Sequence, residues 1–241
     1  MLLVRSLIFQ VWMYGLMAIL GVVFAPLAIW SRDGAYFAIS IYLRLVFWGL
    51  QAICGLTAET RGEIPEGDVL IAAKHQSFLD VLILVRDLPA AKFVMKRSLV
   101  WAPILGFYAL RIGASPVTRG KGAASVEEMV EEAEKRRALS GQLVIYPQGT
   151  RVAPDEAAPY KRGAWHLYRS YGLPCVPAAV NTGVFWPRKG VARRPGRAVV
   201  ELAPALPAGM EKDAFLQTLE TTIENASGRL LAEAKAQASG T

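Results

Sequence analysis

The stretch DVLIAAKHQSFLD, residues 68–80, decides the fold class of this chain. After its opening aspartate, five apolar residues predict a buried strand from Asp68 to Ala73, followed by a polar turn and a helix that begins at Ser77. His75 therefore falls at the carboxyl end of a strand. From Gly67 onward, short apolar runs alternate with helix-periodic stretches, which is typical of an α/β sheet. We expect a mixed, largely parallel central sheet flanked by helices.

The same patterns predict further elements downstream. Strands are expected at 92–95, 116–118, 142–146, 175–180 and 198–202, and helices at 103–111, 125–139, 163–171 and 212–233. Pro103 suits the first turn of the first of these helices. The helix at 125–139 is expected to open with a capping box in which Ser125 and Glu128 bond each other's backbone. Its charged residues are interpreted as structural.

Two long apolar runs precede this pattern. The run from Leu7 to Trp30 is uncharged and 24 residues long, which as a helix would reach about 36 Å and could cross a bilayer. The run from Ala35 to Leu56 is broken only by Arg44, which is costly at a bilayer centre. A shallow hairpin in one leaflet and two true spans are equal alternatives, and burial in a soluble core is a third. In the shallow hairpin Arg44 reaches the headgroups, with Trp12, Trp30, Tyr36 and Trp48 near the interface.

The domain organisation that follows is a membrane-embedded helical hairpin at 1–60 and a catalytic domain at 61–241. The formal charge of +7 and the pI near 9.5 favour an anionic partner. Charge alone does not show whether that partner is nucleic acid, lipid or a phosphorylated substrate. Two cysteines, Cys54 and Cys175, are too few for a disulfide framework or a zinc ligand set. No metal site is expected.

His75 and Asp80 are the candidate catalytic pair. A carboxylate bonded to Nδ1 would fix the imidazole tautomer and leave Nε2 free to take a proton from an alcohol. The alternative is structural, because Asp80 also lies three residues after Ser77 and could cap the helix.

Basic residues near this pair are typical of an anion site. In the segment YPQGTR, residues 146–151, a turn after a predicted strand would present Gln148, Gly149, Thr150 and Arg151. Arginine offers a planar fork for phosphate oxygens and glycine allows close backbone approach. Arg119 and Lys96 are further candidates for the same anion. An ordinary strand-exit turn with solvated charges is the alternative.

The order of these segments resembles that of the 1-acyl-sn-glycerol-3-phosphate acyltransferases and their glycerolipid acyltransferase relatives. Four blocks carry the resemblance over residues 67–183: His75 and Asp80; Lys96, Pro103, Gly106, Gly113 and Arg119; Tyr146, Pro147, Gly149, Thr150 and Arg151; Lys161, Gly163, Val176 and Pro177. The chain departs from the family pattern at Lys74, Thr118 and Gln148, where asparagine, aspartate and glutamate are usual. Because glutamine carries no charge, a proton-transfer role at position 148 is not expected.

The resemblance implies that His75, oriented by Asp80, deprotonates the sn-2 hydroxyl of lysophosphatidic acid, which attacks an acyl thioester to give phosphatidic acid. It implies that Lys96, Arg119 and the segment Gln148, Gly149, Thr150 and Arg151 bind the acceptor. Acyl-CoA or an acyl carrier protein would supply the acyl group, and no cofactor is expected.

We expect membrane lipids but no nucleic acid as partners, and a location at the cell inner membrane with the catalytic domain on its cytoplasmic face. The basic residues at 188–197 are a candidate contact for anionic lipid or for the acyl carrier.

Other functions fit less well. No Gly-x-Ser-x-Gly elbow is present, the segment 113–121 only approximates a phosphate loop, and two histidines cannot build an ordinary metal site. The alternatives that stay open are an acyltransferase for another lyso-lipid, such as a lyso-ornithine lipid, and a non-catalytic membrane protein that binds or tethers lipid.

Overall fold

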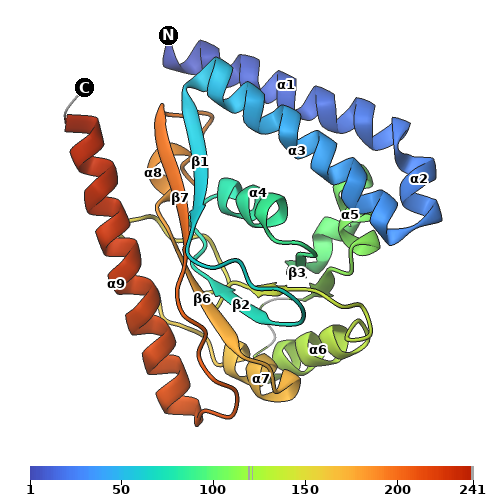
Figure 1. Cartoon of the computed structure of the whole chain (residues 1–241), viewed down its shortest axis with the longest axis vertical. Coiled ribbons are helices and arrows are strands. Elements are labelled where there is room, and N and C mark those ends of the chain that lie inside the picture. The colour runs from blue at the N-terminus through green and yellow to red at the C-terminus, as the bar shows by residue number, and fades with distance from the viewer. Residues whose placement is uncertain (119, 121, 240–241) are drawn as a thin grey trace.

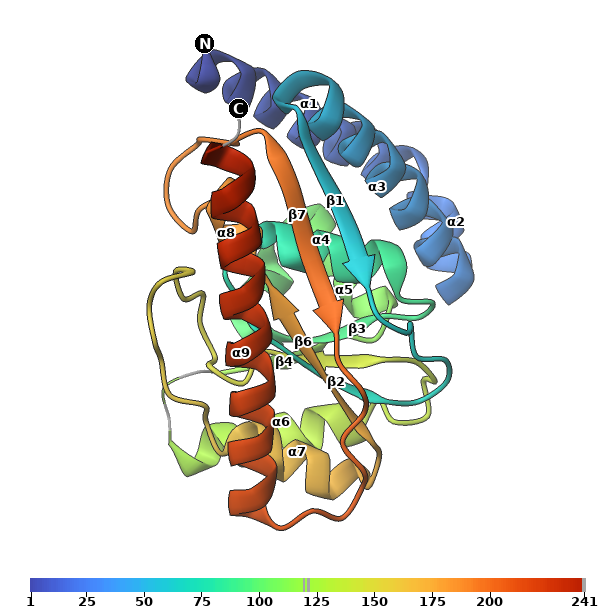
Figure 2. The same cartoon turned by 60° about the vertical axis from the view of Figure 1, so that its left-hand side comes forward.

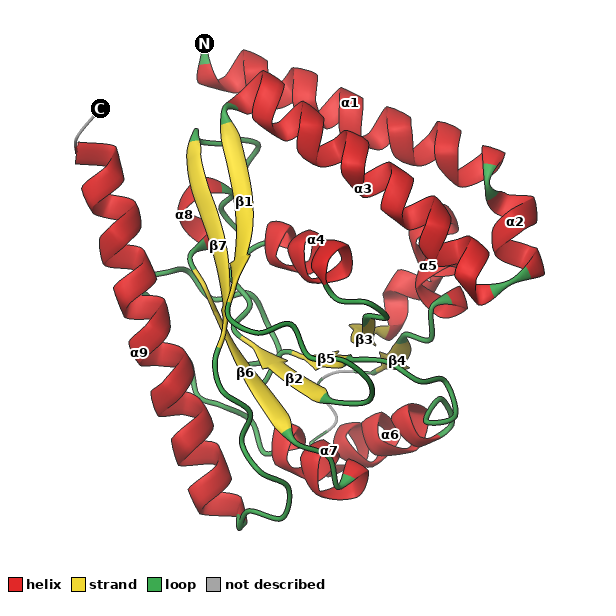
Figure 3. Ribbon diagram, viewed as in Figure 1, coloured by secondary structure: helices red, strands yellow, loops and turns green. Residues whose placement is uncertain are grey.

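The computed structural model describes residues 1–118, 120 and 122–239. Its strands are β1 (Leu56–Arg61), β2 (Leu70–Ala73), β3 (Lys92–Lys96), β4 (Ser115–Val117), β5 (Leu143–Ile145), β6 (Cys175–Val180) and β7 (Gly196–Leu202). In the described chain they form one sheet in the order β1-β7-β6-β2-β5-β3-β4 (Figure 3). Among the described strands the β6–β7 pairing is the antiparallel one, and the other neighbours pair in parallel. The prediction of a mixed, largely parallel sheet is confirmed.

Helices cover both faces of this sheet (Figures 1 and 2). They are α1 (Leu2–Val23), α2 (Ala25–Trp30), α3 (Arg32–Cys54), α4 (Phe78–Asp87), the 3-10 helix η1 (Arg97–Trp101), α5 (Pro103–Arg111), α6 (Ala123–Glu134), α7 (Gly163–Tyr171), α8 (Thr182–Phe185) and α9 (Lys212–Ser239). One core lies between the sheet and α1, α3 and α4, and a second lies between the sheet and α6, α7 and α9.

Strand β2 is central to both cores. Its side chains alternate between the sheet faces, so that Ile71 and Ala73 join the first core while Leu70 and Ala72 join the second. It pairs in parallel with β5 on one side and β6 on the other. The turn after β2 is therefore flanked by the turns that follow β5 and β6.

The two apolar runs form the expected hairpin, although its first arm is interrupted. Helix α1 ends at Val23, and α2 begins after Phe24 with Pro26 in its first turn, where the missing N–H of proline cannot continue the preceding helix. Ser31 caps α3 by accepting a hydrogen bond from the Gly34 amide at 2.9 Å. Gly55 ends α3 with φ of +68°, a conformation that glycine adopts without strain.

The hairpin is packed against the rest of the protein. The Tyr108 hydroxyl of α5 donates to the carbonyl of Gly21 at 3.1 Å, and the Arg111 guanidinium donates to that of Ala28 at 2.7 Å. Helix α3 also contributes Leu43, Val46 and other residues to the first core. These contacts hold the hairpin alongside the sheet. The predicted boundary between domains at residue 60 lies inside β1, which belongs to the sheet.

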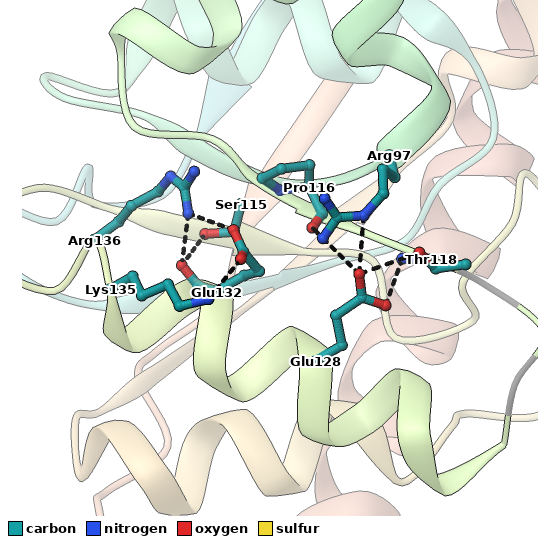
Figure 4. Close-up of polar contacts among 8 residues, drawn as sticks. All are labelled: Arg97, Ser115, Pro116, Thr118, Glu128, Glu132, Lys135 and Arg136. Atoms are coloured by element: carbon teal, nitrogen blue, oxygen red, sulfur yellow. Dashed lines mark hydrogen bonds and ion pairs between the residues drawn. The ribbon is translucent and has the colours of Figure 1, made fainter.

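The capping box expected at Ser125 and Glu128 does not open α6, and that prediction is wrong. The helix begins at Ala123 after Gly122 and ends at Glu134, earlier than the expected residue 139. Glu128 instead accepts hydrogen bonds from Arg97 and from the Thr118 amide (Figure 4). Arg97 is the largest cause, followed by Thr118, of the lowered pKa of the Glu128 carboxyl.

The charges at the end of α6 and just after it form ion pairs, in agreement with the structural role expected for them. The Glu132 carboxylate pairs with Arg136 at 2.6 Å and with Lys135 at 3.0 Å (Figure 4). Strand β1 was not predicted. Its sequence LTAETR has one fully buried side chain and gives little signal for a strand at the edge of a sheet.

A buried lysine ties the central strand to α9. Lys74, which follows β2 directly, is 2% exposed, and its ammonium lies 2.5 Å from the Glu224 carboxylate. The Tyr160 hydroxyl donates to the other oxygen of Glu224 at 2.9 Å. Burial and the Glu224 charge raise the pKa of this hydroxyl, so it stays protonated as a donor. One carboxylate thus joins α9, the central strand and the loop before α7.

We predict that Glu224→Gln lowers the free energy of unfolding by about 1–3 kcal/mol, because the buried Lys74 amine would lose its carboxylate partner. Denaturant unfolding in a neutral detergent measures the change. Glu220→Gln is the matched control on an exposed position of α9, one turn away, and should change the free energy of unfolding by less than about 0.5 kcal/mol. Equal losses in the two variants would contradict a specific role for Glu224.

Candidate active site

The turn after β2 is shaped by Asp80. Its Oδ2 accepts hydrogen bonds from the backbone amides of Gln76 at 2.9 Å and Ser77 at 2.8 Å, and the Ser77 hydroxyl accepts one from the Leu79 amide at 3.0 Å. These bonds form a capping box at the start of α4. They satisfy amides that the helix itself cannot pair, and they fold the Asp80 side chain back over the turn.

The other oxygen of the same carboxylate reaches the histidine. Asp80 Oδ1 lies 2.9 Å from His75 Nδ1, with the Asp80 side chain fully buried and the His75 side chain 14% exposed. The capping box and the dyad, which the sequence left as alternatives, are therefore both present. Each uses a different oxygen, and the cap fixes the carboxylate that orients the imidazole.

Two further hydroxyls surround Asp80. The Tyr146 hydroxyl donates to Oδ1 at 3.4 Å, and the Thr182 hydroxyl donates to Oδ2 at 3.3 Å. Burial first, and then the Asp80 charge, raise the pKa of Tyr146 well above its ordinary value, so this hydroxyl remains a donor. The Tyr146 ring also stacks on the His75 imidazole, with centroids 4.0 Å apart and planes at 20°. The imidazole is held by a ring face as well as by a carboxylate.

Sequence reasoning did not place Tyr146 or Thr182 at the catalytic pair. Tyr146 entered only as the aromatic residue of its block, and Thr182 was not a candidate. Their position in the chain could have indicated this contact. Each follows a strand that pairs with β2, so each lies at the same edge of the sheet as His75.

Backbone contacts lock the histidine turn to both neighbouring loops. The Val152 amide donates to the His75 carbonyl at 2.8 Å. On the other side, the Gly183 amide donates to Gln76 Oε1 at 3.0 Å. Val152 follows Arg151, and Gly183 follows Thr182, so the three turns at this edge form one bonded unit.

The segment 148–151 lies in the turn after β5. Gly149 has φ of +70°, and its amide donates to the Tyr146 carbonyl at 2.8 Å. A Cβ at Gly149 would lie 2.9 Å from the Lys161 ammonium, which is the movable end of a flexible side chain, so the positive φ is the stronger reason for glycine at this position. Thr150 is exposed, and Arg151 is half-buried. The turn thus brings a tight backbone and a guanidinium to the edge that carries His75.

Gln148 is 2% exposed and is held by the same loop. Its Nε2 donates to the Ala158 carbonyl at 3.2 Å, while its buried Oε1 has no hydrogen-bond partner within the described part of the chain. An amide suits this place, since a carboxylate would face the Ala158 carbonyl without a donor.

The remaining candidates are less central. Lys96 is exposed at the carboxyl end of β3, on the same edge but two strands away from β2. Arg119 lies outside the described residues.

Cys54 and Cys175 are free and buried. His166 is exposed on α7 beside Trp165, and the described residues contain no cluster of metal ligands.

Comparison with known proteins identifies the family. The family model described as Acyltransferase matches residues 56–181, which is more than half of the chain. The chain belongs to the Acyltransferase family, and the resemblance carried by the four sequence blocks is confirmed.

Individual relatives agree with this assignment. A protein named 1-acyl-sn-glycerol-3-phosphate acyltransferase from Pseudomonas aeruginosa is 27% identical over 199 residues, which cover 82% of this chain and 77% of that protein. The protein of the same name from Saccharomyces cerevisiae is 29% identical over 180 residues, or 72% of this chain and 59% of its own length. The human alpha form is 28% identical over 170 residues, or 68% of this chain and 60% of that one. The chain thus spans about three fifths of the two eukaryotic relatives.

The fold is also known from a solved structure. The crystal structure of a 1-acyl-sn-glycerophosphate (LPA) acyltransferase from Thermotoga maritima superposes with a TM-score of 0.77 and covers 95% of this chain and 98% of that one. At 16% identity this similarity concerns the fold. It extends over the N-terminal helices as well as the sheet.

We predict that Asp80→Asn keeps the fold and lowers kcat by about 10³- to 10⁴-fold. The asparagine oxygen would still accept the amides of Gln76 and Ser77, which turns its NH₂ group toward His75 Nδ1. The imidazole proton would then move to Nε2, where a base needs a free lone pair. Steady-state acyl transfer measures the loss, and circular dichroism checks the fold. A variant that keeps more than about a tenth of the wild-type kcat would argue against the dyad.

Proposed function

We propose that this protein transfers a fatty acyl group from an acyl thioester to the sn-2 hydroxyl of lysophosphatidic acid, forming phosphatidic acid. The observation that carries the proposal is the bonded His75–Asp80 pair beside an arginine turn. The names of the aligned relatives support this acceptor.

The geometry suits general-base catalysis. With Nδ1 donating to Asp80, His75 Nε2 carries the free lone pair, and no hydrogen bond occupies it within the described residues. In the proposed step Nε2 takes the proton of the acceptor hydroxyl as its oxygen attacks the thioester carbonyl. The C–S bond then breaks, and the thiolate takes the proton back from the imidazolium. Asp80 stabilises the imidazolium, and no acyl-enzyme forms.

The proposed phosphate site lies in the turn after β5. Arg151 would supply a planar fork, and the tight backbone at Gly149 and Thr150 would let phosphate oxygens approach. Lys96 and Arg119 are proposed as further cations for the same headgroup. The neutral Gln148 adds no negative charge beside the anion, which favours its binding over the glutamate that is usual in the family.

We also propose that the hairpin seats the protein at the cell inner membrane, with the catalytic domain on the cytoplasmic face. Helices α1 and α3 are long and apolar enough to cross a membrane. Large apolar side chains point outward from the hairpin, including Val11 at 75% and Trp30 at 88% exposure. Both substrate and product carry acyl chains, so a site at the lipid surface shortens their path. Acyl-CoA or an acyl carrier protein is proposed as the donor.

The experiment that tests the reaction supplies purified protein in lipid with labelled acyl thioester and a panel of lyso-acceptors, including lysophosphatidic acid and a lyso-ornithine lipid. The expected product is phosphatidic acid. His75→Ala should lose about 10²- to 10⁴-fold in rate because its base is gone. His166→Ala is the matched control, since this exposed histidine of α7 takes no part in the proposed chemistry. Full activity of a folded His75→Ala variant would overturn the mechanism, and acylation of another acceptor alone would overturn the proposed substrate.

Membrane seating gives a separate prediction. Ile8→Ser with Val11→Ser replaces two outward-facing apolar side chains of α1, which are 52% and 75% exposed. Partial burial in lipid contributes about 1 kcal/mol for each, so binding to phospholipid vesicles should fall about tenfold or more. Vesicle flotation measures the binding. Ala18→Ser on the same helix is the control, and equal binding of all three proteins would contradict contact between this face of α1 and lipid.

A further inference from the structure

The loop from Trp186 to Pro195, which we call the basic loop, connects α8 with β7 and lies beyond the residues that the family model matches. It contains Arg188, Lys189, Arg193 and Arg194. The Arg188 guanidinium donates to the Arg151 carbonyl at 2.8 Å, and the Arg151 guanidinium donates to the Arg188 carbonyl at 3.5 Å. These reciprocal bonds place Arg188 beside Arg151.

Among the described residues, no carboxylate forms an ion pair with either arginine. The acids nearest to Arg151 in sequence, Asp155 and Glu156, are exposed elsewhere in their loop. A carbonyl oxygen satisfies one N–H group but does not neutralise a cation. Each guanidinium has five N–H donors, so most donors of both arginines remain available. Two arginines that bond to each other's backbone and keep free donors suit an anion of more than one charge.

The basic loop is fixed at both ends. At its start, Thr182 contacts Asp80 and the Gly183 amide bonds to Gln76, so α8 is attached to the histidine turn. At its end, the Arg193 amide donates to the Ser6 hydroxyl of α1 at 2.8 Å, and the Arg193 guanidinium lies 3.9 Å from the Trp186 ring centroid. The loop therefore runs between the catalytic turn and the apolar hairpin, with Arg188 at its catalytic end.

We propose that Arg188 and Arg151 together clamp a phosphate monoester, which makes Arg188 a specificity-determining residue for the acceptor. The inference rests on the proposed function, whose acceptor ends in such a group. A monoester carries close to two negative charges at neutral pH and three terminal oxygens, enough for both arginines. A phosphodiester carries one charge and two such oxygens. The clamp therefore selects the monoester over diester lyso-lipids that share its acyl chain and hydroxyl.

Direct binding tests the clamp independently of catalysis. The probes are dodecyl phosphate, a monoester, and methyl dodecyl phosphate, its diester, titrated calorimetrically into the full chain in neutral detergent. The neutral micelle removes general attraction to an anionic surface. Arg188→Met should raise the Kd of the monoester about ten- to hundredfold, because a charge-assisted contact is lost, and should raise that of the diester much less. Arg188→Lys should restore part of the monoester affinity.

Matched variants decide the interpretation. Lys189→Met removes a neighbouring exposed charge from the basic loop and should shift the monoester Kd by less than about threefold. In Arg151→Met with Arg188→Met, the combined loss should differ from the sum of the single losses because both side chains bind one group. Equal weakening of monoester and diester by Arg188→Met, or equal effects of Arg188→Met and Lys189→Met, would overturn the proposal.

The two proposals fail separately. If the wild type binds dodecyl phosphate with the predicted dependence on Arg188 but forms no phosphatidic acid, the clamp stands and the proposed function fails. If phosphatidic acid forms while Arg188→Met binds both probes as the wild type does, the function stands and the clamp fails.

Discussion

The structure depends on one buried carboxylate that serves two neighbours at once. Asp80 is fully buried, and its charge is tolerated because both oxygens have close donors. One oxygen holds the amides of Gln76 and Ser77 at the start of α4, while the other holds His75. The cap therefore fixes the carboxylate, and the carboxylate fixes the imidazole. A change that disturbs the helix start also disturbs the orientation of the histidine.

The arrangement of strands brings the remaining groups to this carboxylate. Because β5 and β6 flank β2 in parallel, residues that follow three separate strands meet at one edge. Tyr146 arrives from β5 and Thr182 from β6, and both hydroxyls contact Asp80. The antiparallel β7 follows β6, so the chain must return through the basic loop that carries Arg188. This topology explains why the basic loop, which lies outside the matched blocks, is found beside Arg151.

Local sequence predicted the parts of the fold that local physics controls. The helices at 103–111 and 163–171 and the strand at 175–180 have the predicted bounds, because proline, glycine and apolar continuity mark their ends. The His75–Asp80 contact could be predicted because the two residues are only five positions apart. Contacts between segments far apart in the sequence could not be predicted in this way. Glu128 bonds Arg97 in place of the expected cap, β1 pairs with a strand far along the chain, and Arg188 reaches Arg151 through a loop with no motif of its own.

The pairing of β1 with β7 has a consequence for the order in which the molecule is assembled. Leu56 is in register with Gly196, so β1 stays without its partner until about 140 further residues have been synthesised. Loop closure over that separation is slow, whereas the hairpin needs only adjacent residues. The hairpin can therefore form before this edge of the sheet closes. During that interval β1 exposes an unpaired edge beside a hairpin that is already complete in sequence.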